Sequence, residues 1–385
     1  MFNFSYHNPV NIIFGKGTIC QLAELLPKDG NIMLVYGGGS IKRNGVYDQV
    51  IKAAPGRRLI EFSGIEPNPR YETLMRAVEV VKREKINFLL AVGGGSVIDG
   101  VKFIAAAALW QGADPWDFMP DHGQAVRAAL PLGVVLTLPA TGSEMNPNSV
   151  VTRESTREKL FFGSPHVMPH FSILDPETTY TLPPRQTANG AIDAFVHVME
   201  QYMTCPAGAP LQDRQAEAVL LTLIEAGPKA LEHPNDYDTR ASLMWAATQA
   251  LNGLIGCGVP HDWTTHMIGH EITALYGLDH AVTLAIVLPA VWRHKRQHKA
   301  AKLLQYAARV WGIRDGDENA RINAAIEKTE KFFQSLGVAT RLKDYDVKNG
   351  LGAIAQQCEK HGLPLGEHQD IWRKDVETII DLCRE

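Results

Sequence analysis

Three features are missing from this sequence of 385 residues: long apolar runs, paired cysteines and an excess of positive charge. No apolar run reaches the roughly 18 residues that a membrane-spanning helix needs. The formal net charge is −4, so the charge balance gives no reason to expect nucleic acid or an anionic membrane as a partner. The sequence therefore predicts a globular protein with neither of these partners.

Cysteine is scarce and shows no pairing pattern. The five cysteines are odd in number, widely scattered and form no Cys-x-x-Cys pair, which predicts ordinary thiols in a reducing compartment. Residues 1–7 lack a basic region followed by an apolar core, so no secretory signal is expected. Together these features predict a cytoplasmic protein.

The common nucleotide-binding signatures are missing as well. The chain has no Gly-Lys-Ser/Thr of a nucleotide-triphosphate loop, and its two glycine-rich segments do not spell Gly-x-Gly-x-x-Gly. These segments are instead two copies of Gly-Gly-Gly-Ser, at 37–40 and 93–96, and each follows a short apolar run. Glycine lets the backbone approach a ligand closely, and the N–H groups of a following helix attract phosphate. The pattern implies a nucleotide without specifying which one.

Residues 1–182 alternate apolar runs of strand length with segments of helical spacing. The runs are apolar at nearly every position, as is typical of strands buried on both faces, and cover 31–36, 87–92 and 132–138. The helical segments cover 71–82 and 97–109. This alternation predicts an α/β domain with a Rossmann-like parallel sheet, which binds ligands at the carboxyl ends of its strands.

Strand-like runs stop after residue 182. The remainder, residues 183–385, consists of long helix-compatible segments separated by turns that contain proline and glycine. It predicts an all-α second domain with helices at 213–226, 240–256, 262–276, 281–293, 299–311, 321–336 and 371–384.

Two pairs of polar residues in this second half have helical spacing. Asp193 and His197 are four residues apart, as are His266 and His270, so each pair leaves one face of a helix about one turn apart. Apolar neighbours surround both pairs, and a buried titratable group needs a partner. Either pair alone would more often be a satisfied core pair than a metal site. The two pairs together favour a metal site.

His280 joins this set if the chain turns back before it. One continuous helix from 266 to 280 would hold its terminal histidines about 21 Å apart, too far to share an ion. Gly277 predicts a helix stop, and Asp279 is a possible cap for the next helix. One carboxylate and three imidazoles would then suit a borderline divalent cation, Fe(II) or Zn(II).

A third pair with the same spacing, His294 and His298, lies in a run of positive charge at 293–299. Nearby cations oppose metal binding. The run therefore predicts a solvated helix face rather than a second metal site.

Several motifs, in order along the whole chain, resemble those of the iron-containing (group III) alcohol dehydrogenase family, and more narrowly its NADPH-dependent aldehyde reductase or butanol dehydrogenase branch. They are Gly-Ile-Glu-Pro-Asn-Pro at 64–69, Gly-Gly-Gly-Ser-Val-Ile-Asp at 93–99, Leu-Pro-Ala-Thr-Gly-Ser-Glu at 138–144, Asn-Gly-Ala-Ile-Asp-Ala-Phe-Val-His at 189–197, His-Met-Ile-Gly-His-Glu at 266–271 and Gly-Leu-Asp-His at 277–280. The resemblance implies a dehydroquinate synthase-like architecture and a homodimer.

The resemblance also implies roles for individual residues. The expected metal ligands are Asp193, His197, His266 and His280, and His270 is expected to line the site as a candidate proton relay. The expected cofactor site comprises Gly37, Gly38, Gly39, Ser40, Gly93, Gly94, Gly95, Ser96, Asp99, Thr137, Thr141, Ser143 and Lys159. For Lys159, a solvated surface position is the alternative.

The expected choice between NAD and NADP(H) depends on whether an acidic residue follows the first strand. NAD-using enzymes that resemble this chain carry an acidic residue after the first strand, where it accepts a hydrogen bond from the ribose 2′-hydroxyl. Residues 37–43 contain no acid, but they do contain Lys42 and Arg43. A carboxylate would repel a 2′-phosphate, whereas small residues, a hydroxyl and cations accommodate it. NADP(H) is therefore expected, although surface charge alone would also explain the two cations.

Together with these features, the resemblance implies a metal-dependent oxidoreductase that reversibly transfers hydride from NADPH to short-chain aldehydes and gives primary alcohols. Three alternatives stay open: polyol oxidation as in glycerol dehydrogenases, a metal-dependent lyase of the dehydroquinate synthase type, and a non-catalytic nucleotide-binding protein. The sequence does not choose between iron and zinc, because the ligand set suits both.

Overall fold

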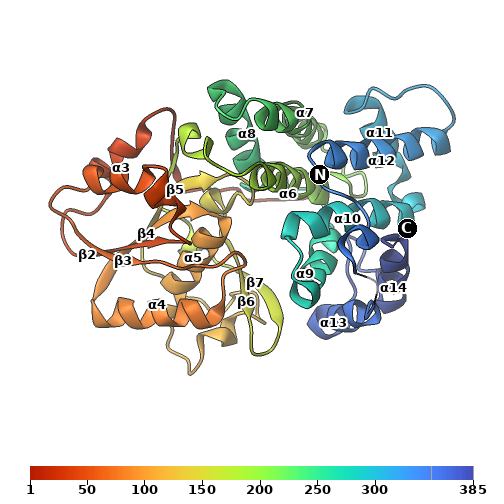
Figure 1. Ribbon diagram of the computed structural model, residues 1–385. Coiled ribbons are helices and arrows are strands. Elements are labelled where there is room, and N and C mark those ends of the chain that lie inside the picture. Colours follow the sequence, from red (N-terminus) through yellow and green to blue (C-terminus); the bar gives the residue numbers. More distant parts are fainter. Residues whose placement is uncertain (348, 385) are drawn as a thin grey trace. The chain divides into compact units, whose positions relative to one another are not determined.

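The computed structural model describes residues 1–347 and 349–384, with an α/β half followed along the chain by a helical half (Figure 1). Six strands form one sheet in the order β1-β8-β5-β4-β2-β3, and each neighbouring pair is parallel. The strands are β1 (Asn11–Phe14), β2 (Asn31–Tyr36), β3 (Arg58–Phe62), β4 (Ile86–Gly94), β5 (Leu132–Leu138) and β8 (Phe171–Leu174). The predicted parallel sheet is confirmed, and the three apolar runs are three of its four inner strands, β2, β4 and β5.

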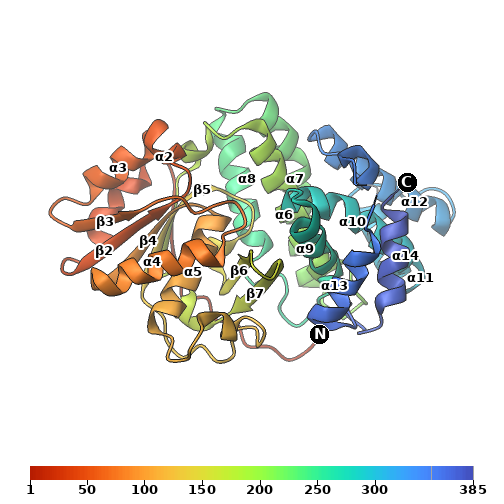
Figure 2. The same ribbon diagram turned by 60° about the horizontal axis from the view of Figure 1, so that its bottom comes forward.

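Side chains of β2 alternate between the two faces of the sheet, and helices cover both faces. Met33 and Val35 belong to the core cluster formed with α4 (Tyr71–Arg83) and α5 (Gly95–Leu109). Ile32 and Leu34 belong to the opposite cluster, which includes α3 (Val46–Ala53). Figure 2 shows α4 and α5 along one side of the strands and α3 on the other. Burial on both faces explains why these strands are apolar at nearly every position.

An antiparallel hairpin, β6 (Asn148–Arg153) and β7 (Glu158–Gly163), follows β5 and was not predicted. Polar residues in both strands keep the apolar runs short, so no strand pattern stands out in the sequence. The hairpin is attached to α5 through Asp99, whose Oδ2 accepts the backbone N–H of Val150 at 3.0 Å. The Oγ of Ser149 also donates to the Asp99 carbonyl at 2.8 Å.

Helices dominate the second half, which confirms the predicted fold class. They are α6 (Pro184–Tyr202), α7 (Pro210–Glu232), α8 (Tyr237–Ala250), α9 (Thr264–Tyr276), α10 (His280–His294), α11 (Arg296–Arg309), α12 (Glu318–Ser335), α13 (Gly352–Gly362) and α14 (Arg373–Leu382). The helix predicted at 240–256 ends at Ala250, before Gly253 and Gly258, which have φ values of 87° and 69°. Helix α13 was not predicted. In the described part of the chain, no helix is long and apolar enough to cross a membrane.

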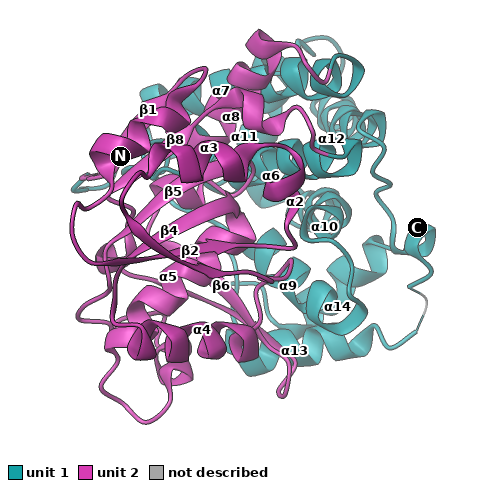
Figure 3. Cartoon of the chain, turned by 60° about the vertical axis from the view of Figure 1, so that its left-hand side comes forward, with its two compact units in different colours: residues 1–6, 183–233, 249–385 teal, residues 7–182, 234–248 magenta. Residues whose placement is uncertain are grey.

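The chain divides into two compact units, which Figure 3 shows in different colours. One unit contains residues 7–182 and 234–248, and the other contains 1–6, 183–233 and 249–385. Most of α8 belongs to the α/β unit because Met244 packs in its core and Thr248 donates to Oε1 of Glu144 at 2.6 Å. The division into functional domains at 1–182 and 183–385 stays a prediction.

Candidate functional site

Five of the predicted site residues lie on three helices of the helical unit. Helix α6 carries Asp193 and His197, α9 carries His266 and His270, and α10 begins at His280. Helix α10 packs against both α6 and α9. The three helices therefore bring together side chains that lie far apart in the sequence.

The turn between α9 and α10 brings His280 back towards His266. Gly277 ends α9 with a φ of 71°, a conformation that costs glycine little, so the predicted helix stop is confirmed. Asp279 does occupy the N-cap position of α10, but its side chain does not cap the helix. Its Oδ2 accepts instead from Nε of Arg185 at 2.7 Å, so the predicted side-chain cap is wrong.

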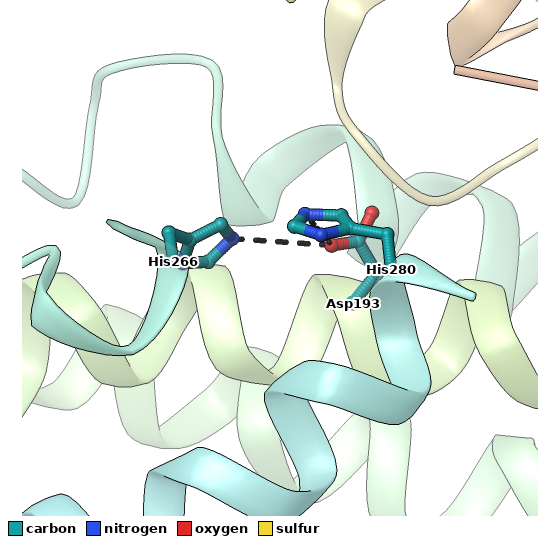
Figure 4. Close-up of side chains that lie close together, drawn as sticks. All are labelled: Asp193, His266 and His280. Carbon is teal, nitrogen blue, oxygen red and sulfur yellow. Dashed lines mark ion pairs between the residues drawn. The ribbon is translucent and has the colours of Figure 1, made fainter. Parts of the chain in front are cut away.

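The Nε2 atoms of three histidines converge on one carboxylate oxygen, Oδ1 of Asp193. This oxygen lies 3.7 Å from Nε2 of His280 and 3.8 Å from Nε2 of His197. The Nε2 of His266 lies 4.0 Å away, and Figure 4 shows Asp193 with His266 and His280. The ligand atoms of these last three residues all lie within 4.8 Å of one another. His280 is half-buried and the other side chains are buried.

These separations suit a shared metal ion better than direct hydrogen bonds. An N–H···O hydrogen bond measures about 2.9 Å. Two ligands, each about 2.1 Å from a tetrahedral ion, lie about 3.4 Å apart. Among the described residues, no hydrogen bond reaches the buried Oδ1 of Asp193, and a buried carboxylate charge needs a cation or donor. The donor set therefore fits one Fe(II) or Zn(II) ion.

Glu200, which received no role from the sequence, holds the ring of His266. Oε1 of Glu200 lies 2.9 Å from Nδ1 of His266 and accepts the backbone N–H of the same residue, also at 2.9 Å. Burial, and then the nearby carboxylate of Asp262, raise the pKa of Glu200 to about 8, whereas the backbone N–H of His266 opposes this shift. The signal that could have identified Glu200 is its spacing, one helical turn after His197 on the same face.

Aromatic rings line the same group of histidines. The ring centroid of His270 lies 5.0 Å from that of His280 and 6.3 Å from that of His266. Trp263 precedes α9 and packs edge-on against His266, with the centroids 5.3 Å apart. Its φ of 64° lies in the left-handed region, which aromatic residues rarely adopt. His270 thus lies beside the converging side chains, and its role as a proton relay stays a prediction.

The positive run at 293–299 is not a solvated face, so that prediction is wrong for most of the run. Nε2 of His294 lies 3.0 Å from Oδ1 of Asp375, and Nζ of Lys299 lies 2.7 Å from Oδ2 of Asp262. Lys299 is buried, and within residues 293–299 only Gln297 and His298 are exposed. Carboxylates from distant segments neutralise the positive charges of this run. The sequence around the run does not predict these partners.

In the α/β unit, most of the predicted cofactor residues gather at one edge of the six-stranded sheet, whereas Lys159 lies on β7. The segment at 37–40 follows β2, and the segment at 93–96 spans the end of the neighbouring strand β4 and the start of α5. Thr137, Thr141 and Ser143 lie at the end of β5 or just after it. Because these strands are parallel, their carboxyl ends share one edge. Helix α5 begins at Gly95, so its first N–H groups also lie there.

The glycines of the two tetrapeptides differ in what surrounds them. A Cβ on Gly95 would lie 2.5 Å from Oγ1 of Thr141, and a Cβ on Gly93 would lie 2.6 Å from Cγ2 of Val97. No described atom lies within 4 Å of a Cβ on Gly38. Packing alone therefore requires glycine at 93 and 95, whereas Gly38 borders open space.

Asp99, Ser143 and Lys159 are buried, and the first two belong to one hydrogen-bonded chain. Oγ of Ser143 donates to Oδ1 of Asp99 at 2.6 Å and accepts from Nζ of Lys102 at 2.8 Å. Burial raises the pKa of Asp99 and lowers that of Lys102 to about 8, and the attraction between the two charges opposes both shifts. Lys159 is buried, so the alternative of a solvated surface lysine is wrong. Lys102 was missed, although it lies one turn after Asp99.

Lys42 and Arg43 differ in the contacts that their side chains make. Nζ of Lys42 lies 2.8 Å from Oε2 of Glu61, which also accepts from the hydroxyl of Tyr36 at 2.7 Å. The hydrogen bond from Lys42, followed by that from Tyr47, lowers the pKa of Glu61 to about 2. Arg43 is exposed and donates a long bond of 3.4 Å to the carbonyl of Gly39. Arg43 is therefore the less engaged of the two cations.

Known sequences that resemble this chain extend over its full length. The NADPH-dependent aldehyde reductase YqhD of Escherichia coli (strain K12) is 58% identical, and the alignment covers 100% of both chains. The probable NADH-dependent butanol dehydrogenase 1 of Bacillus subtilis (strain 168) is 44% identical over 99% of both chains.

Known structures and family models agree with these relatives. The crystal structure of E. coli K-12 YqhD matches with a TM-score of 0.99 at 56% identity, covering 100% of this chain and 99% of that chain. NADH-dependent butanol dehydrogenase A from Thermotoga maritima matches with a TM-score of 0.94 at 37% identity, again over 100% and 99%. The model described as iron-containing alcohol dehydrogenase matches residues 9–176, and that of the family's C-terminal part matches 187–382. The chain therefore belongs to the iron-containing alcohol dehydrogenase family.

Proposed function

We propose that this protein is an NADPH-dependent aldehyde reductase, which reversibly converts short-chain aldehydes to primary alcohols. The observation that carries the proposal is the convergence of three imidazole nitrogens on Asp193 in a member of the iron-containing alcohol dehydrogenase family. The E. coli relative is named an NADPH-dependent aldehyde reductase, which supports the cofactor and the substrate class. Relatives named butanol dehydrogenases support short aliphatic substrates.

The proposed ligands of one Fe(II) or Zn(II) ion are Asp193, His197, His266 and His280. When bound, the ion supplies the Lewis acidity that polarises a carbonyl group, and NADPH supplies the hydride. The chain itself contributes position: packed helices hold the ligand atoms close together, so little reorganisation is needed at each turnover. His270, beside His280, is the proposed group that holds a proton for the product oxygen.

The proposed cofactor site is the carboxyl edge of β2, β4 and β5. The N–H groups at the start of α5 are suited to a pyrophosphate, and the absent side chain of Gly38 leaves room beside β2. Both oxygens of Asp99 accept hydrogen bonds within the protein, from Ser143 and Val150. Asp99 is therefore proposed to hold the segments that form this edge. Lys159 and Ser143 are proposed to complete the site.

Removal of the metal is the test of this function. Treatment with a chelator is expected to abolish NADPH-dependent reduction of butanal, because the carbonyl loses its Lewis acid. Added Fe(II) or Zn(II) should restore the rate, and the metal that copurifies with the protein identifies the resident ion. Metal content is measured by mass spectrometry and turnover by NADPH absorbance. A metal-free protein that keeps the full rate would contradict the proposal.

Glycerol with NAD⁺ is the comparison reaction for polyol oxidation, the open alternative on the same fold. The proposed function predicts a higher kcat/KM for butanal with NADPH than for glycerol with NAD⁺. The reverse order would favour a glycerol dehydrogenase. Loss of both activities from the metal-loaded protein would favour a non-catalytic nucleotide-binding protein.

Gly38→Asp is expected to lower the NADPH/NADH ratio of kcat/KM about 10- to 100-fold. The added carboxylate would repel a 2′-phosphate beside β2, and about 1.4–2.8 kcal/mol of repulsion corresponds to this change. A Cβ at this position would have no described atom within 4 Å, so the backbone leaves room for a side chain. Gly38→Asn is the matched control, because it adds the same volume without the charge. Equal ratios for the two variants would show that the 2′-phosphate binds elsewhere.

A homodimer and a cytoplasmic location complete the proposal. The resemblance to the family supports the homodimer, and the five scattered cysteines, which form no paired motif, support a reducing compartment such as the cytoplasm. Light scattering of the purified protein tests the first, and fractionation of the source cells tests the second.

A further inference from the structure

Helix α6 presents a second carboxylate on the face that carries Asp193 and His197. Glu200 is three residues after His197 and is only 3% exposed. Its Oε1 accepts two bonds from one residue, His266: from the backbone N–H at 2.9 Å and from the ring Nδ1 at 2.9 Å. One oxygen thus fixes both the first turn of α9 and the orientation of the His266 ring.

We propose that Glu200 is a positioning residue that fixes the metal-binding tautomer of His266. A neutral imidazole has one N–H, and metal binding requires the other nitrogen to keep its lone pair. Oε1 accepts the backbone N–H, which is the role of the carbonyl-type oxygen whether or not the other oxygen carries a proton. The same oxygen is therefore the acceptor for the ring, and the hydrogen lies on Nδ1. The lone pair of Nε2 is then directed to the side of Asp193, whose Oδ1 is 4.0 Å away.

A further backbone hydrogen bond fixes the position of Glu200. Its carbonyl accepts the backbone N–H of Asp262 at 2.9 Å. Oδ1 of Asp262 accepts the backbone N–H of Thr264, the first residue of α9, at 3.1 Å, and Oδ2 of Asp262 lies 2.7 Å from Nζ of Lys299. The carboxylate and its acceptor role are therefore built into the fold, as is usual for groups that orient metal-binding histidines.

The inference rests on the proposed metal site. A series of three variants distinguishes a failure of the inference from a failure of the metal site. Glu200→Ala removes the acceptor, whereas Glu200→Gln keeps an acceptor oxygen. Glu217→Gln is the matched control: Glu217 is also buried in the helical unit, but it accepts from the hydroxyl of Tyr202. Binding of Zn(II) is measured by competition with a chromogenic chelator, and circular dichroism checks that each variant is folded.

Glu200→Ala is expected to raise the Kd for Zn(II) about 10- to 100-fold. Glu200→Gln should show a smaller increase, and Glu217→Gln should match the wild type. A folded Glu200→Ala variant with wild-type affinity would overturn the inference while leaving the metal site intact. A wild-type protein that binds no Zn(II) would overturn the proposed function and this inference together.

The tautomer itself is measured in the wild-type protein, which needs no variant to fold. With ¹⁵N-labelled histidine, two-bond correlation spectra are expected to show His266 protonated at Nδ1 in the Zn(II) complex. The assignment comes from the loss of one signal set in His266→Gln. In Glu200→Gln the Nδ1–H form should persist, since glutamine still accepts. Protonation of His266 at Nε2 would rule the inference out.

Discussion

Asp193→Asn is expected to lower kcat/KM for aldehyde reduction about 1,000-fold, which corresponds to about 4 kcal/mol. Asparagine keeps the shape of the side chain but removes the only negative charge of the proposed ligand set. The three Nε2 atoms that lie 3.7–4.0 Å from Oδ1 would then face a neutral amide in a buried site. The purified variant should also contain less bound metal, which is measured on the same sample.

Asp213→Asn is the control for this substitution. Asp213 lies on α7 in the same unit, where it accepts from Nε2 of Gln305 at 3.0 Å and pairs with Lys302. Its variant should keep its metal and its rate, although it loses some stability. If Asp193→Asn keeps both metal and activity, the converging side chains are not the catalytic metal site.

Lys299→Met is expected to lower the free energy of unfolding by about 3–5 kcal/mol, the cost of breaking a buried ion pair. Nζ of Lys299 lies 2.7 Å from Asp262 and 2.8 Å from Glu367, and it donates to the carbonyl of Met203 at 2.7 Å. Burial alone would lower the pKa of Lys299, but the charges of these two carboxylates raise it, so the amine stays protonated. Methionine would leave two carboxylates and a carbonyl buried without their donor.

Thermal unfolding followed by circular dichroism measures this loss. At about 2–4 °C per kcal/mol for a unit of this size, the midpoint should fall by about 10 °C. Lys331→Met is the control, because Lys331 is exposed on α12 of the same unit and should change the stability by less than about 0.5 kcal/mol. Equal midpoints for the two variants would contradict the prediction and show that the Lys299 cluster adds no net stability.

The framework of this protein was predictable because its signals are local. Strands β2, β4 and β5 are apolar at nearly every position, and glycine or proline stands at the end of each strand or directly after it, so their residues alone indicate strands buried on both faces. Gly277 marks the end of α9 because few other residues adopt its left-handed conformation. The spacing of Asp193 with His197, and of His266 with His270, indicated a metal site for the same reason: a helix places such residues on one face.

Only the tertiary structure decided which polar groups are buried and what they contact. Residues 293–299 read as a solvated run, but Lys299 is 1% exposed because Asp262 and Glu367, both distant in sequence, neutralise it. Glu200 looked like an ordinary helix residue until α9 brought His266 within 2.9 Å of it.

The same distinction applies to α8 and to the β6–β7 hairpin. Helix α8 has the composition of the helical unit, yet most of it belongs to the α/β unit through Met244 and Thr248. The polar hairpin is held by Asp99 on α5. The periodicity of a segment shows which of its faces is apolar, so the sequence by itself determined the helices and strands and the spacing of the proposed ligands. The partners of each polar group come from other segments, so only the tertiary structure decided which groups meet.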